Sequence, residues 1–352
     1  MNKNMDDGTK ELVFLLLGNN PTLPFAECRA ILESNGVPFK EIRRLDQVLI
    51  ISAPFEACRL VARQAGLVRR VCVLLTQSAK TPESMLRAVD SLDIKGVLGP
   101  KASFAVRIKG VRGHSKGLNI NELERRIGGQ IQEKAKWARV DLAKPDVLFY
   151  TIITGDSAFV CQSVEEVEER GFGLRRPGSR PFFHPSSMHP RLARTMVNLS
   201  EARPGSRFLD PFCGSGGILV EAGVIGCKLI GMDIDPKMSK GSKENLDALG
   251  IDSKNICVGD ARHIPMKEID SVATDPPYGR SSSTKGNETF KLVEESLEDM
   301  ASILKLHGRV CISVPSNINV ADFRLNDLRM VEKHSFRVHR SLTRNIVTFA
   351  RL

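Results

Sequence analysis

The tetrapeptide Asp275-Pro276-Pro277-Tyr278 is the stretch of this 352-residue sequence with the clearest chemical signature. It follows a segment of strand character, residues 270–274, which the prolines end because they cannot donate to a sheet ladder. We expect the Asp275 carboxylate, two carbonyl oxygens and the Tyr278 ring to lie together at a strand's carboxyl end, where open α/β sheets bind ligands. Such oxygens accept hydrogen bonds from an exocyclic amino group, while the aromatic ring stacks on its base.

This arrangement suits an exocyclic amino group of a nucleobase as the reacting nitrogen. An aromatic amine is a poor nucleophile because its lone pair is delocalised into the ring. Hydrogen bonds from its two N–H groups to Asp275 and to the Pro276 carbonyl would draw the nitrogen toward tetrahedral geometry, through positioning and electrostatics. Asp275 can also take the departing proton. Arg280, close after the tetrapeptide, is expected to hold a flanking phosphate.

A glycine-rich turn after an apolar strand near residue 208 is a second candidate site. Glycine permits a tight turn and a close approach of backbone to ligand. The turn lacks the Lys-Ser/Thr pair of a triphosphate loop and is not a full dinucleotide motif, so its spacing alone is weakly specific. Its candidate ligand-binding residues are Asp210, Pro211, Cys213, Gly214, Gly216 and Gly217.

Further carboxylates end successive predicted strands. Asp233 lies about twenty residues after the glycines, where it can accept from a ribose diol. Asp260 follows a strand at 255–260 and is placed for an adenine amino group. Because the carboxyl ends of parallel strands meet at one edge, these acids and Asp210 and Asp275 should line that edge. Further strands are predicted at 309–314, 335–340 and 344–351.

This succession resembles the class I S-adenosylmethionine-dependent methyltransferases over residues 191–352. The resemblance implies a Rossmann-like α/β domain with a seven-stranded sheet and an antiparallel last hairpin. It also implies that S-adenosylmethionine is the cofactor, with Asp210 and the glycine turn at its methionine part. The ribose is assigned to Asp233 and adenine to Asp260 and Ala261, and Ile234 is a further expected cofactor-binding residue. D-P-P-Y matches the motif used on adenine N6, cytosine N4 and guanine N2.

The front half of the chain is the more basic one. Residues 1–180 hold 28 Lys and Arg against 21 Asp and Glu, whereas residues 181–352 hold 23 against 20. A folded basic surface favours a polyanion partner, most often nucleic acid, although general solubility explains the charge equally well. The order strand-helix-strand-strand-helix-strand before residue 78 fits a ferredoxin-like unit.

Residues 79–165 resemble the THUMP domain of RNA-modifying enzymes. The resemblance lies in Phe104-x-Val106-Arg107, in the helix carrying Glu122-Leu123-Glu124, and in V-D-L-x-x-P-D at 140–146. It implies an α+β domain that docks the acceptor end of tRNA; the alternative is an α/β domain with a solvated basic strand. The candidate RNA-binding residues here and in the Gly-, Pro- and Arg-rich stretch 171–181 are Arg107, Lys109, Arg112, Lys116, Arg175 and Arg176.

Composition bounds the remaining possibilities. Eight scattered cysteines without a C-x-x-C pair argue against a zinc ribbon, an iron–sulfur cluster and a disulfide framework, so we expect no metal and a reducing cytoplasm. His184 and His189 lack an acidic or thiol partner nearby in the sequence. No apolar run is long enough to span a membrane and Met1–Lys10 lack a signal core, so no membrane partner is expected.

Taken whole, the sequence resembles the archaeal THUMP-containing tRNA guanosine-N2 methyltransferases that act at position 10. The alternatives are a DNA or ribosomal RNA amino-methyltransferase and a non-catalytic RNA-binding protein; the THUMP-like half argues against DNA. Expected partners are tRNA and, since eukaryotic relatives need one, a small activating subunit. The expected parts are a ferredoxin-like domain (1–78), a THUMP domain (79–165), a linker (166–190) and a methyltransferase domain (191–352). Mono- or dimethylation is left open.

Overall fold

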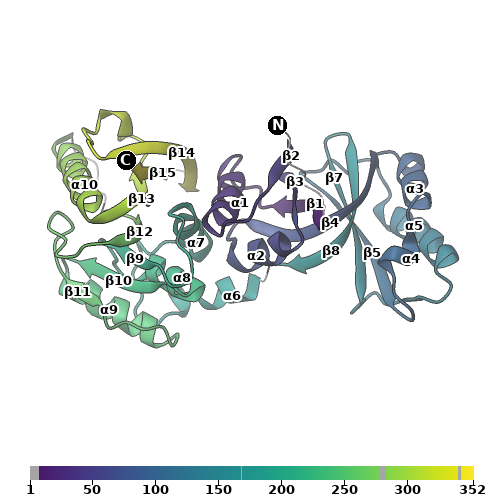
Figure 1. Cartoon of the computed structure of the whole chain (residues 1–352), viewed down its shortest axis with the longest axis horizontal. Helices are drawn as coiled ribbons and strands as arrows, with labels where there is room; N and C mark the ends of the chain where they lie inside the picture. Colours follow the sequence, from purple (N-terminus) through teal and green to yellow (C-terminus); the bar gives the residue numbers. More distant parts are fainter. Residues whose placement is uncertain (1–7, 168, 278–282, 340–341) are drawn as a thin grey trace. The chain divides into compact units, whose positions relative to one another are not determined.

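The structure of the protein, a computed structural model, describes residues 8–167, 169–277, 283–339 and 342–352. These residues form two compact units, each built on one sheet (Figure 1). We call them the N-terminal unit and the C-terminal unit. The N-terminal unit contains 8–21, 37–63 and 68–167, and the C-terminal unit contains 22–36, 64–67 and the described residues from 169 onward.

One eight-stranded sheet runs through the whole described part of the N-terminal unit, in the order β2-β3-β1-β4-β8-β7-β5-β6. Its first four strands pair antiparallel in the order of a ferredoxin-like unit, as predicted. The sheet then continues because β4 pairs antiparallel with β8. The strands are β1 (Thr9–Leu16), β2 (Lys40–Leu45), β3 (Val48–Pro54), β4 (Val68–Ala79), β5 (Ser103–Gly110), β6 (Arg139–Val140), β7 (Val147–Thr154) and β8 (Ser157–Glu166).

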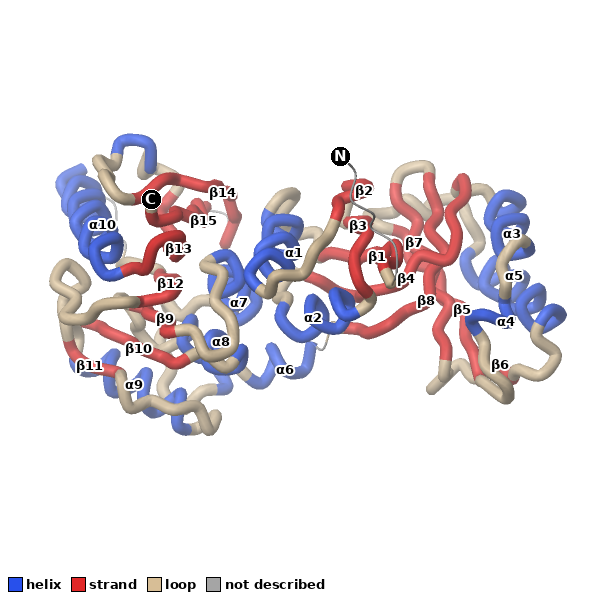
Figure 2. Tube along the Cα trace, in the orientation of Figure 1, coloured by secondary structure: helices blue, strands red, loops and turns tan. Residues whose placement is uncertain are grey.

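Helices α3 (Pro82–Asp90) and α5 (Ile120–Lys134) pack on this sheet near β5, together with the single turn α4 (Ile94–Val97) (Figure 2). The apolar stripe of α5 is buried, with Leu123, Ile127 and Ile131 at most 3% exposed. Asn119 caps α5, because its side chain accepts from the Glu122 backbone N–H at 3.2 Å. The remaining helix of this region is α2 (Glu56–Gln64).

The C-terminal unit has the sheet order β11-β10-β9-β12-β13-β15-β14. The first five strands are parallel, and β15 pairs antiparallel with both β13 and β14. This confirms the predicted seven-stranded sheet and its last hairpin. The strands are β9 (Arg207–Asp210), β10 (Lys228–Asp233), β11 (Ile256–Val258), β12 (Ile269–Thr274), β13 (Leu304–Pro315), β14 (Leu328–His339) and β15 (Leu342–Arg351).

Helices cover both faces of this sheet, with α8 and α9 on one side and α10 on the other (Figure 1). The face under α10 holds a core that includes Val293, Leu297 and Met300. The helical segments of this unit are α1 (Leu23–Ser34), α6 (Glu169–Leu174), α7 (Pro190–Leu199), α8 (Gly217–Ile225), α9 (Pro236–Asp247), α10 (Ser283–Ile303) and the 3-10 turns η1 (Pro177–Ser179) and η2 (Val320–Asp322).

Helix α1 lies in the C-terminal unit, although the sequence placed it in the domain 1–78. The reason is Glu27, whose fully buried carboxylate accepts from the Gly66 and Leu67 backbone N–H groups, both at 2.8 Å. It also accepts from Thr195 and Asn198 of α7, at 3.0 and 2.8 Å. Burial raises the pKa of Glu27, and these hydrogen bonds oppose the rise. The four-part division of the chain remains a prediction, while the structure groups the described residues as two units.

The segment 169–190 is packed into the C-terminal unit rather than forming the linker that its composition predicted. Arg175 donates from Nε to Glu221 of α8 at 2.7 Å, and its guanidinium also faces the Phe172 ring at 5.0 Å. Arg180 is 6% exposed and donates to the Arg175 carbonyl at 2.9 Å. A Gly-, Pro- and Arg-rich composition cannot reveal a buried carboxylate elsewhere in the chain that draws the arginines inward.

Replacing Glu27 by Ala should destabilise the protein by roughly 3 kcal/mol or more, because several buried donors would lose their acceptor. The matched control is Glu33→Ala on the same helix, where the side chain is half exposed and pairs with Arg29 only at 3.8 Å. That change should stay within about 0.5 kcal/mol. Urea unfolding followed by circular dichroism measures both; equal effects of the two variants would contradict a role for the Glu27 network.

Candidate active site

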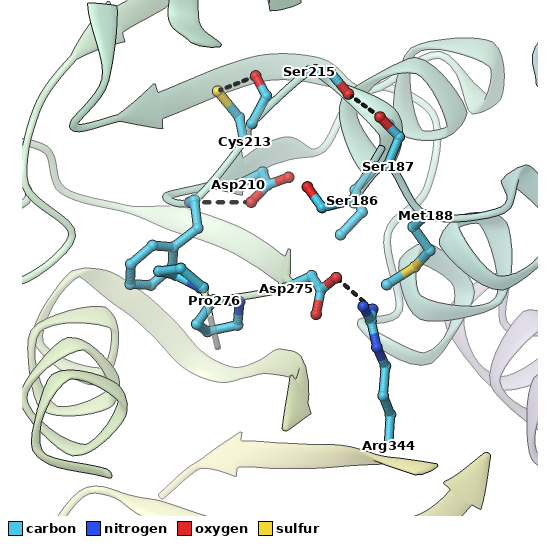
Figure 3. Close-up of a pocket in the computed structure, with 14 residues that line it drawn as sticks. Ser186, Ser187, Met188, Asp210, Cys213, Ser215, Asp275, Pro276 and Arg344 are labelled. Atoms are coloured by element: carbon cyan, nitrogen blue, oxygen red, sulfur yellow. Dashed lines mark hydrogen bonds and ion pairs between the residues drawn. The ribbon is translucent and has the colours of Figure 1, made fainter. Parts of the chain in front are cut away.

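A cavity of about 280 Å³ opens at the carboxyl edge of the C-terminal sheet. It lies between the end of β9, the glycine turn, the end of β12, β15 and the segment before α7 (Figure 3). The 14 described residues that line it are Ser186, Ser187, Met188, Asp210, Phe212, Cys213, Gly214, Ser215, Gly217, Ile218, Asp275, Pro276, Pro277 and Arg344.

Asp210 ends β9 and forms the floor of this cavity, with 1% of its surface exposed. Its Oδ1 accepts from Thr274 Oγ1 at 2.6 Å and from the Phe212 backbone N–H at 3.2 Å. Burial raises the pKa of Asp210 to about 7, and the negative charges of Asp233 and Asp275 add to the rise. Near neutral pH, a bound cation would therefore shift this carboxyl group to its ionised form.

The glycine turn needs its glycines for conformation and for space. Gly216 has φ +78°, and a Cβ there would lie 2.5 Å from Ser242 Oγ. Gly214 has φ +51° and no heavy atom of the described residues within 4 Å of the place of a Cβ, so its backbone is open to a ligand. Ser215 Oγ is hydrogen-bonded to Ser187 Oγ at 2.7 Å, which ties the turn to the segment before α7.

Asp233 is fixed against this turn at the end of β10. Its Oδ2 accepts from the Gly214 backbone N–H at 2.8 Å, and its Oδ1 accepts from the Asp235 N–H at 2.9 Å. Ile234, which follows, is 69% exposed. Asp233 and Ile234 are not among the cavity-lining residues, and they lie beside it on the same sheet edge.

Asp260 and Ala261 follow β11 on that edge and also lie outside the cavity lining. Arg262 clamps the Asp260 carboxylate with bonds from Nη2 at 2.6 Å and from Nε at 3.0 Å. These bonds lower the pKa of Asp260 to about 2. The structure thus separates the acids of the edge: Asp210 and Asp275 line the cavity, and the other two continue beyond it.

Asp275 follows β12 and forms an ion pair inside the cavity with Arg344 of β15, at 2.5 Å between Oδ2 and Nη1 (Figure 3). Pro276 and Pro277 line the cavity next to Asp275, as the motif predicted. Tyr278 and Arg280 lie outside the described residues. Sequence reasoning missed Arg344, because it is 69 residues from Asp275 and no local pattern links them.

Other cavity residues also escaped the sequence analysis. Ser186, Ser187 and Met188 were read as part of a linker, yet they form one wall. Thr274 was counted only as a strand residue, although its hydroxyl is the hydrogen-bond donor to Asp210. No local pattern signals this contact, because Thr274 and Asp210 are 64 residues apart in the sequence.

The predicted RNA-binding residues in the described part of the chain differ in their exposure. Lys109, Lys116 and Arg176 have exposed side chains, as does Arg112, which pairs with Asp46 at 3.2 Å. Arg107 is half-buried and donates to the Leu142 carbonyl at 3.1 Å. Arg175 is different, because its guanidinium is held inside by Glu221, a side chain with no exposed surface. The prediction that Arg175 contacts phosphate therefore conflicts with the structure.

Two features are absent from the described residues. No helix in them is long and apolar enough to cross a membrane. No group of three or more His, Cys, Asp and Glu in the same residues is arranged to hold a metal ion. The two histidines of the segment before α7 have local roles: His184 is hydrogen-bonded to Ser186 at 2.7 Å, and His189 accepts from the Arg191 backbone N–H.

The sheet order, the glycine turn and the acids at successive strand ends define a class I S-adenosylmethionine-dependent methyltransferase. Consistent with this, the family model of the RMKL-like methyltransferase domain matches residues 177–346, and that of the THUMP domain matches 79–162. The chain is 36% identical over 343 residues to the tRNA (guanine(10)-N2)-dimethyltransferase of Methanothermobacter thermautotrophicus, covering 97% of this chain and 100% of that protein. It therefore belongs to the archaeal THUMP-domain tRNA guanosine-N2 methyltransferase family.

Further relatives agree with this assignment. The tRNA (guanine(10)-N2)-dimethyltransferase of Pyrococcus abyssi is 33% identical over 334 residues, covering 94% of this chain and 96% of that protein. Among solved structures, TrmN from Thermus thermophilus has a TM-score of 0.57 at 22% identity, covering 97% of this chain and 100% of that one. SMU.472, solved with SAH, has a TM-score of 0.56 at 16% identity, covering 99% of both chains. These two structures show the shared fold.

The site fits S-adenosylmethionine, the cofactor of this class. The open backbone at Gly214 allows close approach of a ligand, and the buried carboxyl of Asp210 provides an acceptor that a cation would ionise. When bound, the cofactor supplies a methyl group whose bond to sulfur breaks with both electrons left on sulfur.

Cofactor affinity should depend on pH through Asp210. Its raised pKa of about 7 means that the carboxyl is neutral below pH 7, and a positively charged ligand binds its ionised form more tightly. Affinity should rise up to about eightfold between pH 6 and pH 7.5, following the ionised fraction of such a group. Calorimetry across this range measures it. Asp210→Asn should remove the dependence, whereas Asp260→Asn should keep it, because Asp260 is ionised throughout. A sloping profile in Asp210→Asn would refute this role.

Proposed function

We propose that this enzyme methylates N2 of guanosine 10 in tRNA, and that it adds two methyl groups in succession. The observation that carries the proposal is the placement of Asp275 and Pro276 in a cavity beside Asp210 and the glycine turn, in a chain that matches position-10 relatives over nearly its full length. The names of those relatives supply the position and the second methyl group, and the cavity supplies the chemistry.

The mechanism assigns the nucleobase to the Asp275 side of the cavity. The Asp275 carboxylate and the Pro276 carbonyl oxygen would accept from the two N–H groups of N2, which turns the nitrogen lone pair toward the methyl donor. Asp275 then takes the proton that N2 loses and returns it to water. The target base must first leave its helix, at a cost of a few kcal/mol. The assigned stacking partner, Tyr278, belongs to the undescribed residues 278–282.

The cofactor would extend from the cavity along the sheet edge. Asp210 and the turn residues Pro211, Cys213, Gly214, Gly216 and Gly217 are assigned to its methionine part. The acids beyond the cavity, Asp233 and Asp260, are assigned to ribose and adenine, together with Ile234 and Ala261. The exposed Ile234 offers an apolar surface of the kind on which an adenine ring packs.

The N-terminal unit is the proposed tRNA-docking module. Double-stranded RNA is bound largely through shape and backbone contacts, for which exposed cations without an aromatic platform suffice. The proposed contacts of this unit are Lys109 and Lys116, with Arg107 and Arg112 in supporting roles. Arg176 and Arg280, from the other part of the chain, are further proposed RNA contacts. A cytoplasmic location is part of this proposal, since tRNA is the substrate. A small activating subunit is a further proposed partner, and the activity of the purified chain alone tests the need for it.

The other candidate functions have less support. A DNA enzyme would share the D-P-P-Y chemistry, but the match to a THUMP domain at 79–162 favours RNA. A ribosomal RNA substrate would keep both domains and differ only in the docked RNA. A non-catalytic role conflicts with an intact acid at each of the four strand ends and with a cavity that contains Asp275.

The decisive measurement is nucleoside mass spectrometry of tRNA after incubation with labelled S-adenosylmethionine. The wild type should produce N2-methylguanosine and N2,N2-dimethylguanosine. Asp275→Ala should bind tRNA normally but lose methyl transfer by at least about 100-fold, since the acceptor and proton carrier are removed. Asp252→Ala, an exposed acid of the same unit, serves as control. Methyladenosine in the wild type, or turnover by Asp275→Ala, would refute the assignment.

Removing Lys109 and Lys116 together by mutation to Gln should weaken tRNA binding and reduce its salt dependence. If each contacts one phosphate, the slope of log K against log salt should fall by roughly 1.5, because fewer counterions are released. The matched control is Lys40→Gln with Arg43→Gln on β2, at the other edge of the same sheet. Filter binding at several salt concentrations gives the slopes. Equal slopes for the two double variants would place the RNA elsewhere.

A further inference from the structure

The ion pair between Asp275 and Arg344 lies inside the cavity and is largely shielded from water. The side chains of Arg344 and Asp275 are 10% and 16% exposed, and both line the cavity. Arg344 is the sole cation among the described residues of this lining, and its guanidinium points toward the Asp275 carboxylate (Figure 3). The general motif requires only an oxygen acceptor at its first position, so the paired cation is a feature to be explained.

The effect of Arg344 on Asp275 follows from charge. A carboxylate in a partly enclosed site next to the buried Asp210 would hold its charge poorly without a counter-ion. An adjacent guanidinium favours the ionised form. An ionised carboxylate only accepts hydrogen bonds, whereas a protonated one carries an O–H that also donates. Arg344 therefore decides which hydrogen-bonding pattern Asp275 presents to a base.

Guanine is the amino base that matches an acceptor-only group. Its N2 amino group is next to N1–H, so one edge presents two adjacent donors. In adenine and cytosine, the ring nitrogens next to the amino carbon carry lone pairs, which an ionised carboxylate repels. A carboxylate has about four lone-pair sites on its two oxygens, so the bond from Arg344 to Oδ2 is compatible with contacts to a base.

We propose that Arg344 determines base specificity by keeping Asp275 ionised, so that the site accepts guanine through N1–H and N2–H together. Arg344 is a positioning residue here, because it acts through Asp275. The inference rests on the proposed function, since it concerns recognition of the same target guanosine. It goes beyond that function in naming the second contacted atom of the base and the residue that enforces the contact.

The same pairing accounts for a second methylation. The first transfer leaves N2 with a single hydrogen, so a site that needs both N2 hydrogens would release the monomethylated base. N1–H is unchanged by the reaction. Contact of Asp275 with N1–H and with the remaining N2–H would hold the methylated guanosine in the same orientation for another round.

The test compares tRNA carrying guanosine at position 10 with the same tRNA carrying 2-aminopurine there. 2-Aminopurine keeps the amino group at C2, but its N1 is an acceptor. The wild type should prefer guanosine by about 100-fold or more in kcat/KM, because an ionised carboxylate would face that lone pair. In Arg344→Met, Asp275 can be protonated and donate to N1, so the preference should fall by at least about tenfold. Arg344→Lys should restore most of it.

Two controls separate the possible outcomes. Arg309→Met removes an Arg–carboxylate pair from the same sheet, where Arg309 contacts Glu201 at 2.6 Å outside the cavity, and it should leave the preference unchanged. Asp275→Asn, whose amide both donates and accepts, should bind the 2-aminopurine tRNA more tightly relative to the guanosine tRNA than the wild type does, as measured by competition without turnover.

The results also distinguish the inference from the function on which it rests. If the wild type makes no methylguanosine at position 10, the proposed function fails. If it does, but Arg344→Met loses activity equally on both tRNAs, Arg344 is only structural and the inference fails. Should Arg344→Met not fold, the Asp275→Asn competition decides, and an unchanged ratio of the two affinities overturns the proposal.

Discussion

The active site depends on one electrostatic constraint: four carboxylates end neighbouring parallel strands, and like charges at one sheet edge repel each other. Each acid has its own solution in the structure. Asp233 accepts two backbone N–H groups, and Asp260 is clamped by Arg262. Asp275 is paired with Arg344. Asp210 receives only neutral donors and remains protonated up to about neutral pH. Asp210 is thus the acid of this edge whose ionisation can respond to a positively charged ligand near neutral pH.

Buried carboxylates also join segments that are distant in sequence. Glu27 ties α1 and residues 64–67 to α7, and Glu221 of α8 holds Arg175 and Arg194, the latter at 2.8 Å. An unpaired charge at such depth would be strongly destabilising, so each carboxylate requires its donors to assemble around it. This explains why a segment that looks like a linker by composition is ordered against α8.

The sequence was informative where the chemistry follows from chain order. Acids after strands, glycines after the first of them and prolines after the fourth are local patterns, and parallel pairing brings them to one edge. That reasoning brought Asp210, Asp275 and the glycine turn to one sheet edge, and in the structure they lie around one cavity. It also predicted the seven-stranded sheet. Strand β14 begins at Leu328, well before the predicted residue 335; the sequence did not show this, because the charged residues near Glu332 interrupt the alternation of apolar and polar residues.

The sequence could not reveal ion pairs between side chains that only the tertiary structure brings together. Arg175 was predicted to face RNA, since an arginine in a Gly- and Pro-rich stretch looks solvated, and only the fold shows Glu221 beside it. Arg262 is only two residues after Asp260, so its proximity could be predicted from the sequence. The hydrogen bonds between the two side chains could not, because they depend on rotamers that a sequence does not specify. The position of Arg344 in the cavity could be predicted only from the order of strands in the sheet.

That strand order explains how acidic side chains and a cation from different parts of the sheet line one cavity. The parallel strands β9 and β12 bring Asp210 and Asp275 to the edge at their carboxyl ends. Strand β15 runs antiparallel between β13 and β14, so its beginning, not its end, reaches the same edge, with Arg344 opposite Pro315. A cation from the last hairpin is thereby set against an acid from the parallel half. The parallel strands carry the groups assigned to the cofactor together with Asp275, and the hairpin contributes the cation that pairs with Asp275. The Asp275–Arg344 pair therefore joins a residue of the parallel strands to a residue of the hairpin, and we infer that this pair selects the base.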